Sequence, residues 1–226
     1  MRLILAGIAA LALTGSLSAQ TIAWNFTDLN GTFDTGTPVN WTVSGITIGN
    51  SFGNVTTPIN GQSVSSGYTT ASGTGNIGNA NNTAGFSLSS PYYEFTITPD
   101  SGFALSLNDL DFGARSTGTG AQAYSIRWSF DSFGTEIAGG SIANNSTWSF
   151  KDNSFASLTA PVDTPVTVRI YAYGGTGSPS SGTINNRLDD IALNVTATSA
   201  IPEPAGAALM GLSGMGVVFM RRRKVA

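Results

Sequence analysis

Alternation of apolar and polar residues dominates the middle of the chain. It is clearest at residues 92–98, 124–130 and 166–172, where every second residue is apolar. Because side chains two positions apart share one face of a strand, each of these segments is predicted to be a strand with one buried face. Interrupted versions of the pattern occur at residues 22–26, 41–48, 103–112, 148–150 and 188–195.

These segments predict an all-β fold. About eight to ten short strands, separated by Gly, Asn and Ser turns and without helical periodicity, favour an antiparallel β-sandwich. Residues 60–85 are rich in Gly, Ser, Thr and Asn and predict a long mobile loop, with room for one irregular edge strand. All four tryptophans fall on the apolar side of their patterns and are predicted to lie in the core: Trp24, Trp41, Trp128 and Trp148.

The two ends of the chain differ from this middle part. Residues 1–19 have a cation at Arg2, an apolar stretch and small residues before Gln20, which is typical of a secretory signal peptide removed by signal peptidase. Cleavage is expected after Ala19, with Ser18 as the alternative. Residues 20–200 then form the β-sandwich ectodomain, a length suited to one domain.

The C-terminal segment, residues 201–226, contains three features in order. Pro202, Glu203 and Pro204 come first, residues 205–220 carry no charge, and a basic cluster follows, made of Arg221, Arg222, Arg223 and Lys224. The prolines favour an extended backbone before a helix that starts near residue 205. As a helix, 205–220 would span about 24 Å, short of the roughly 30 Å hydrocarbon core, and the cations would act as a membrane stop. The sequence therefore predicts a short, marginal transmembrane helix.

This order resembles the sorting signal of PEP-CTERM proteins. In that family an exosortase, a membrane-embedded protease and transpeptidase, is thought to recognise the Pro-Glu-Pro motif, here Pro202, Glu203 and Pro204. The resemblance implies export across the inner membrane, transient anchoring, and a role at the cell surface or in extracellular polysaccharide and biofilm. The alternative for the tail is a plain membrane anchor.

The ectodomain also resembles the jelly-roll modules that PEP-CTERM proteins carry. The matching stretches are residues 91–114, 124–133, 166–174 and 187–194. The resemblance favours a jelly roll over an immunoglobulin-like sandwich, and the Cys…Trp…Cys spacing of true immunoglobulin domains is absent.

Composition excludes several function classes. Of ten Lys and Arg residues five lie in the two ends, and of thirteen acids only Glu203 does, so the ectodomain carries about −7. An acidic surface disfavours nucleic acid as a partner. The sequence has no His and no Cys, which removes Ser-His and Cys-His nucleophiles and the usual zinc ligands.

Sugar binding is the first candidate chemistry. Arg169, Tyr171 and Tyr173 alternate with inward residues of their strand and are expected on its outward face, as is Tyr92. Exposed aromatic planes beside a forked donor suit a polysaccharide. The alternative is cross-strand packing on the outer face of a sandwich.

Calcium is the second candidate. In jelly-roll carbohydrate-binding modules, which the ectodomain resembles, a structural calcium often lies near the first and last strands. Asp189 and Asp190, at the start of the last strand, are the candidate ligands here. The alternative is a solvated turn paired with Arg187. No other cofactor is expected.

An enzyme is not expected. A glycoside hydrolase needs two facing carboxylates, and Glu94 and Glu136 are the only glutamates of the ectodomain. The sequence therefore predicts an exported structural or interaction protein, with a carbohydrate-binding module as the alternative and a glycoside hydrolase as a remote second alternative.

Overall fold

The computed structural model describes residues 19–53, 55, 58–72, 74–176 and 182–200. The predicted signal peptide, apart from Ala19, and the predicted sorting signal at 201–226 lie outside these residues. The chain divides into two compact units, and the sandwich lies in the unit Leu17–Thr198. None of the helices in the described ranges is long and apolar enough to cross a membrane.

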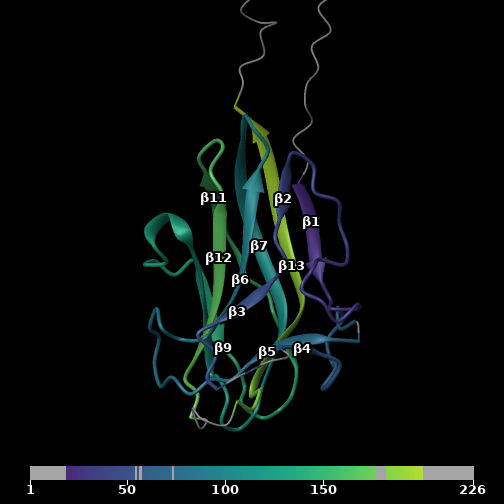
Figure 1. Cartoon of the computed structure of the whole chain (residues 1–226), viewed down its shortest axis with the longest axis vertical. Coiled ribbons are helices and arrows are strands. Elements are labelled where there is room, and N and C mark those ends of the chain that lie inside the picture. Colours follow the sequence, from purple (N-terminus) through teal and green to yellow (C-terminus); the bar gives the residue numbers. More distant parts are fainter. Residues whose placement is uncertain (1–18, 54, 56–57, 73, 177–181, 201–226) are drawn as a thin grey trace, which may run out of the picture. The chain divides into compact units, whose positions relative to one another are not determined.

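Two antiparallel sheets face each other and form a β-sandwich (Figure 1). The first sheet is built from β1 (Ala19–Trp24), β4 (Ile59–Asn60), β5 (Asn76–Asn79), β7 (Phe103–Ser116), β10 (Ser149–Lys151), β11 (Ser154–Ala160) and β13 (Asn186–Ser199). Its order is β10-β7-β13-β5-β4, with β1 added beside β13 and β11 beside β7. The sheet is thus organised around β7 and β13.

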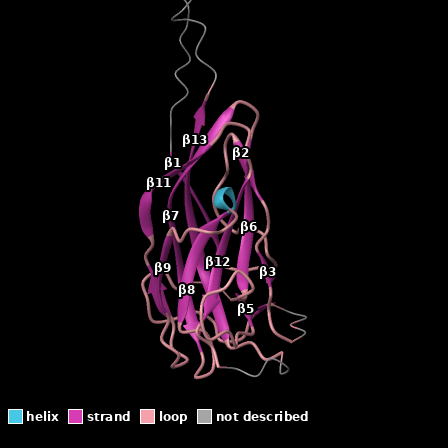
Figure 2. Ribbon diagram, turned by 90° about the vertical axis from the view of Figure 1, so that its left-hand side faces the viewer, coloured by secondary structure: helices cyan, strands magenta, loops and turns pink. Residues whose placement is uncertain are grey.

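The second sheet is built from β2 (Trp41–Val43), β3 (Thr47–Gly49), β6 (Tyr92–Pro99), β8 (Ala123–Trp128), β9 (Ala138–Ser141) and β12 (Val166–Tyr173). Its order is β2-β6-β12-β8-β9, and β3 also pairs with β6. A single 3-10 turn, η1 (Ser129–Asp131), follows β8 (Figure 2). The all-β fold predicted from the alternation is confirmed.

The core fills the space between the sheets, and the period-two pattern decides which side chains enter it. On β6, Tyr93, Phe95 and Ile97 are at most 1% exposed, while the residues between them are half-buried. From the opposite sheet, Trp24 of β1 lies with its ring centroid 4.9 Å from that of Phe95. Burial of these large rings is one of the main sources of hydrophobic stabilisation in the core.

Two expectations about the core are wrong. Residues 60–85 include β5, a buried strand that lies between β13 and β4 instead of at an edge. Trp148 is buried, as expected, although it is not part of the central core cluster, and its indole N–H donates at 3.0 Å to the Ser63 carbonyl oxygen in the loop that precedes β5. Trp128, also expected in the core, is half-buried and packs against the core cluster without being part of it.

The two tryptophans Trp24 and Trp128 therefore make a matched pair for testing the core. Trp24→Ala should lower the free energy of unfolding by about 3–5 kcal/mol, because removal of the fully buried indole ring leaves a large cavity in the core. Trp128→Ala should cost clearly less, since part of its ring is already solvated. Urea denaturation of both variants measures the difference, and equal losses would contradict the assigned depth of Trp128.

Candidate functional site

Strand β12 places the three predicted sugar-binding residues on the outer face of the second sheet. Arg169 lies opposite Glu94 of β6 and Arg127 of β8, and Tyr171 lies opposite Tyr92 and Ser125. Val168 and Ile170, which flank Arg169 in sequence, belong to the core. The outward orientation expected for Arg169, Tyr171 and Tyr173 is therefore correct.

Arg169 is held by contacts on several sides. Its Nε donates to Glu94 Oε2 at 2.5 Å, and a terminal nitrogen donates to the Tyr171 hydroxyl at 3.2 Å. The guanidinium carbon lies 4.1 Å from the ring centroid of Tyr92 and 3.9 Å from that of Phe133. Burial alone would lower the pKa of Arg169, but the hydrogen bonds to Tyr171 and Glu94 outweigh it and raise the pKa. The Glu94 carboxylate is thus fixed in position by a permanently charged partner.

Tyr171 is not an exposed plane, and this part of the expectation is wrong. Its side chain is fully buried, because the rings of Phe86, Tyr92 and Phe133 stand edge-on to it at 5.4, 5.4 and 6.4 Å. Phe86 also contacts Tyr173 at 5.8 Å. We call Phe86, Tyr92, Phe133, Tyr171 and Tyr173 the aromatic cluster. It packs over the sheet and leaves only parts of its outer rings open.

Sequence reasoning missed Phe86 and Phe133, which lie in loops. Phe86 lies in a Gly- and Ser-rich stretch with Leu88 as its apolar neighbour, and Phe133 comes three residues after Phe130, past the end of the alternating segment. Arg127 stacks on the Phe86 ring at 3.8 Å and donates to the Phe133 carbonyl oxygen at 3.2 Å, so the same arginine ties both loops to the sheet. A large aromatic residue in a loop that does not continue the strand alternation was the available signal for such a contact.

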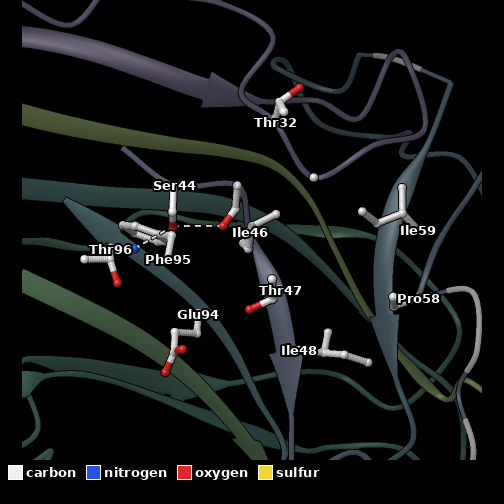
Figure 3. Close-up of a pocket in the computed structure, with 12 residues that line it drawn as sticks. Thr32, Ser44, Ile46, Thr47, Ile48, Pro58, Ile59, Glu94, Phe95 and Thr96 are labelled. Atoms are coloured by element: carbon white, nitrogen blue, oxygen red, sulfur yellow. Dashed lines mark hydrogen bonds between the residues drawn. The ribbon is translucent and has the colours of Figure 1, made fainter. Parts of the chain in front are cut away.

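An open groove lies beside the aromatic cluster, at the β3 side of the sheet (Figure 3). It has a volume of about 720 Å³, within the range of roughly 300–1,000 Å³ common for small-molecule sites. Figure 3 shows Ile46 and Ile48 on one side of it, with Pro58 and Ile59 across from them. Glu94 lines the groove as well, so the groove and the aromatic cluster share the Glu94–Arg169 pair.

Hydroxyl groups supply the rest of the polar lining. Thr32, Ser44 and Thr47 are exposed along the groove, and Thr47 lies directly opposite Glu94 in the β3–β6 pairing. The Ser44 hydroxyl accepts from the Thr96 amide at 2.9 Å and donates to the Gly45 carbonyl oxygen at 2.9 Å, which orients it. A fixed carboxylate, several hydroxyls and aliphatic walls can hydrogen-bond and pack against a sugar ring.

Asp189 and Asp190 lie on the first sheet, at an irregularity of β13. Leu188 and Ile191 both enter the core although three positions separate them, and Asp190 has a φ of 49°. An extra residue in one strand is a β-bulge, and it leaves the Asp190 side chain outside the core. Both aspartates are buried, at 0% and 7% exposed, so the alternative of a solvated turn is wrong.

The loop before β5 covers Asp190 and supplies its hydrogen bonds. Ser65 and Ser72 hydroxyls donate to its carboxylate at 2.9 and 2.7 Å, the Ser72 amide donates at 3.1 Å, and the Tyr68 hydroxyl also donates. These donors use both carboxylate oxygens. The described residues contain no cluster of three or more His, Cys, Asp or Glu that could hold a metal. The arrangement at Asp189 and Asp190 therefore does not fit a calcium site, which needs six to eight oxygen ligands.

Asp189 lacks such a set of donors. Its Oδ1 accepts from the Asp190 amide at 2.8 Å, and its buried Oδ2 has no hydrogen-bond partner among the described residues. Burial, reinforced by the neighbouring Asp190 charge, raises the pKa of Asp189 to about 8. The Asp189 carboxyl is therefore protonated in the folded protein at neutral pH.

This shift predicts an unusual dependence of stability on pH. An unfolded aspartate has a pKa near 3.9, so between about pH 4 and pH 8 the folded state holds a proton that the unfolded state lacks. The free energy of unfolding should consequently fall as pH rises through this window, by up to about 1.4 kcal/mol per pH unit. In denaturant titrations Asp189→Asn should remove this slope, whereas Asp28→Asn, at an exposed position, should keep it. A slope that survives in Asp189→Asn would contradict the assignment.

Comparison with known proteins gives only distant structural similarity. No protein-family model and no curated protein matches the chain. A cleaved adhesin domain of Lys-gingipain from Porphyromonas gingivalis is 13% identical, with 76% of this chain and 96% of that one covered at a TM-score of 0.36. A chitosan-binding module from a Paenibacillus species is 18% identical (69% and 96% covered, TM-score 0.31). A family 11 carbohydrate-binding module from Clostridium thermocellum is 13% identical (79% and 96% covered, TM-score 0.29). Similarities this low assign no function to the chain.

Proposed function

We propose that the described domain is a jelly-roll-like carbohydrate-binding module that takes a polysaccharide into the groove beside Glu94. The observation that carries this proposal is the Glu94–Arg169 pair, which holds a carboxylate at the groove next to exposed hydroxyls. A fixed carboxylate accepts hydrogen bonds from sugar hydroxyls without reorganising, and this lowers the entropic cost of binding.

The polysaccharide should be neutral. Glu94 is negative, and the ectodomain around it carries about −7, so a polyanion would be repelled from this face. Ile48, Ile59 and Pro58 offer aliphatic surface for the C–H faces of a sugar ring, while Thr47 and Ser44 supply further hydrogen-bonding groups. The groove is open along its length, which suits a chain better than a free monosaccharide.

Binding is a better reading of the groove than hydrolysis. Glycoside hydrolysis needs a proton donor and a second carboxylate across the sugar. Glu94 is the one carboxylate among the described residues that line the groove, and its Oε2 is already paired with Arg169 Nε at 2.5 Å, so the described lining supplies no second carboxylate to face it. We therefore propose that the protein is a binding protein without its own catalytic activity.

The groove can be tested by affinity electrophoresis in gels that contain soluble neutral polysaccharides such as xyloglucan, galactomannan and mixed-linkage glucan. The wild-type chain should be retarded by at least one of them. Thr47→Lys should weaken that binding at least tenfold, or about 1.4 kcal/mol, because the lysine fills the groove and pairs with Glu94.

Thr42→Lys is the matched control, since Thr42 is also exposed, lies on β2 of the same sheet and does not line the groove. It should bind as the wild type does. Equal retardation of both lysine variants, or migration unaffected by any of the polysaccharides, would contradict the proposed groove.

We further propose that the protein is exported and sorted to the cell surface or the extracellular matrix by an exosortase. The support is the order of parts in residues 201–226: Pro202, Glu203 and Pro204, a short apolar stretch and four cations. A hydrophobic tail too short for a stable span is suited to removal, as in other C-terminal signals that are cleaved after membrane insertion. A surface location would expose the groove to extracellular polysaccharide. Binding there would give the protein a role in biofilm.

Sorting predicts a defined C-terminus. Intact-mass measurement of the protein from its native host should give an end near residues 201–204, with or without an attached group. Glu203→Ala should leave the tail in place and the precursor in the membrane fraction, whereas Glu136→Ala in the ectodomain should be processed normally. Mature protein that still ends at Ala226 would reduce the tail to a plain anchor.

A further inference from the structure

A second, smaller pocket opens on the first sheet, where β13 begins beside β5 and β4. Its volume is about 260 Å³, and it shares no lining residue with the groove. The lining is mostly polar and consists of Asn60, Gln62, Gly182, Thr183, Ile184 and Arg187. A pocket of this size can hold a single anionic group or one sugar unit.

Arg187 is the charged residue of this pocket, and it points away from the core. Its neighbours in sequence face inward: Asn186 donates to the Tyr93 hydroxyl at 2.9 Å, and Leu188 belongs to the core cluster. The Arg187 stem runs past Gly78 on β5, where an added Cβ would lie 3.3 Å from Arg187 Cγ and would collide with Ile184. The absence of a side chain at Gly78 therefore makes room for the arginine in the pocket.

The guanidinium of Arg187 is almost entirely buried and poorly satisfied. The residue is only 7% exposed, its Nε has no hydrogen-bond partner among the described residues, and a terminal nitrogen makes one long bond of 3.5 Å to the Ile184 carbonyl oxygen. A buried donor left without an acceptor costs about 1–3 kcal/mol, and more when it is charged.

The charge of Arg187 is also uncompensated. In the described part of the chain the ion pairs are Arg169 with Glu94 and Arg127 with Glu136, both on the other sheet. Burial lowers the pKa of Arg187, and the nearby positive charge of Arg115 on β7 lowers it further. A guanidinium nevertheless stays protonated in proteins, so two like charges lie close together without a carboxylate.

We propose that this pocket binds an oxyanion, the carboxylate or sulfate group of an acidic sugar, through Arg187. The planar fork of the guanidinium matches the two oxygens of such a group. The Gln62 backbone and the Asn60 side chain are held together at one wall of the pocket. The Gln62 backbone N–H donates to Asn60 Oδ1 at 3.0 Å, and the Asn76 side chain donates to the Gln62 backbone carbonyl oxygen at 2.6 Å. An anion seated there would satisfy the open Nε and neutralise the buried charge.

The site is independent of the groove and has the opposite selectivity. The groove offers a carboxylate to sugar hydroxyls, whereas this pocket offers a cation to an anionic substituent. Because the ectodomain as a whole is negative, the affinity should be in the millimolar range and should weaken as salt is raised.

The test is thermal unfolding of the purified full chain at constant ionic strength, with sodium glucuronate, galactose 6-sulfate and inorganic sulfate as separate probes and glucose as the neutral control. At least one anion should raise the melting temperature of the wild type saturably, by about 3–6 °C once its concentration is tenfold above its Kd. A response to either acidic sugar supports the proposal, and a response to inorganic sulfate alone would contradict it, because the site would then take the free ion only.

Arg187→Met keeps the volume and removes the charge, so it should abolish the shift. It should also be at least as stable as the wild type without anion, because an unpaired buried charge has been removed. Arg187→Lys keeps the charge but loses the fork and should weaken binding about tenfold, which preserves the test if the methionine variant fails to fold. Lys151→Met, on β10 of the same sheet, should keep the full shift.

Three further results would overturn the proposal. The first is a wild-type melting temperature that none of the anions raises saturably. The second is an equal rise in the wild type and in the Arg187 variants. The third is a rise that Lys151→Met loses to the same degree, since the effect would then reflect overall charge.

Discussion

Strands β12 and β13 are covered on both faces, by the core on one side and by loops on the other. This double coverage determines which polar groups and which parts of the surface remain open to solvent. β12 and β13 each present one face to the common core, and loops cover part of the other face. Tyr171 on β12 and Asp189 on β13 are therefore fully buried although neither points into the core. A polar group in that position has to find a partner within the protein or keep its proton, because water is excluded. The two strands meet this demand differently. β12 uses an arginine between a glutamate and aromatic rings, and β13 uses a bulge that directs Asp190 to hydroxyl donors.

These coverings also determine where a ligand can approach. Loops with Phe86 and Phe133 close the middle of the second sheet, so the surface left open is the groove at the β3 side, which Glu94 lines. On the first sheet the loop before β5 closes the region over Asp190, and the open part is the pocket at the start of β13. In both places a charged side chain marks the boundary between covered and open sheet. The ligand sites follow from incomplete coverage rather than from a separate binding element.

The sequence predicts the sandwich well, because the inward alternation of strands such as β6 and β12 is a local property of period two. Sequence-based prediction fails for residues that are buried by segments far away in the chain. The buried strand β5 has the sequence Asn-Ile-Gly-Asn, and its two asparagines pair with different partner strands, Asn79 with Asn186 of β13 and Asn76 with Asn60 of β4. Tyr171 has the correct face in the pattern, yet its burial depends on Phe86, a residue that alternation cannot connect to it. Likewise, two adjacent aspartates look solvated until a loop more than a hundred residues away donates to one of them.

The charges divide between the sheets in a way that links stability to binding. On the second sheet each arginine has a glutamate, so Glu94 can serve a neutral ligand without being left unpaired. On the first sheet neither of the buried ionisable residues Asp189 and Arg187 has a partner of opposite charge among the described residues. Asp189 holds a proton to avoid a bare carboxylate, and Arg187, which cannot give one up, stays charged. The two residues are two positions apart on β13, and they do not neutralise each other because burial favours the neutral form of the acid. A buried carboxylate can lose its charge by binding a proton, but a guanidinium stays charged and can be neutralised here only by an anion from solution. The unpaired charge of Arg187 therefore supports a ligand site in this pocket.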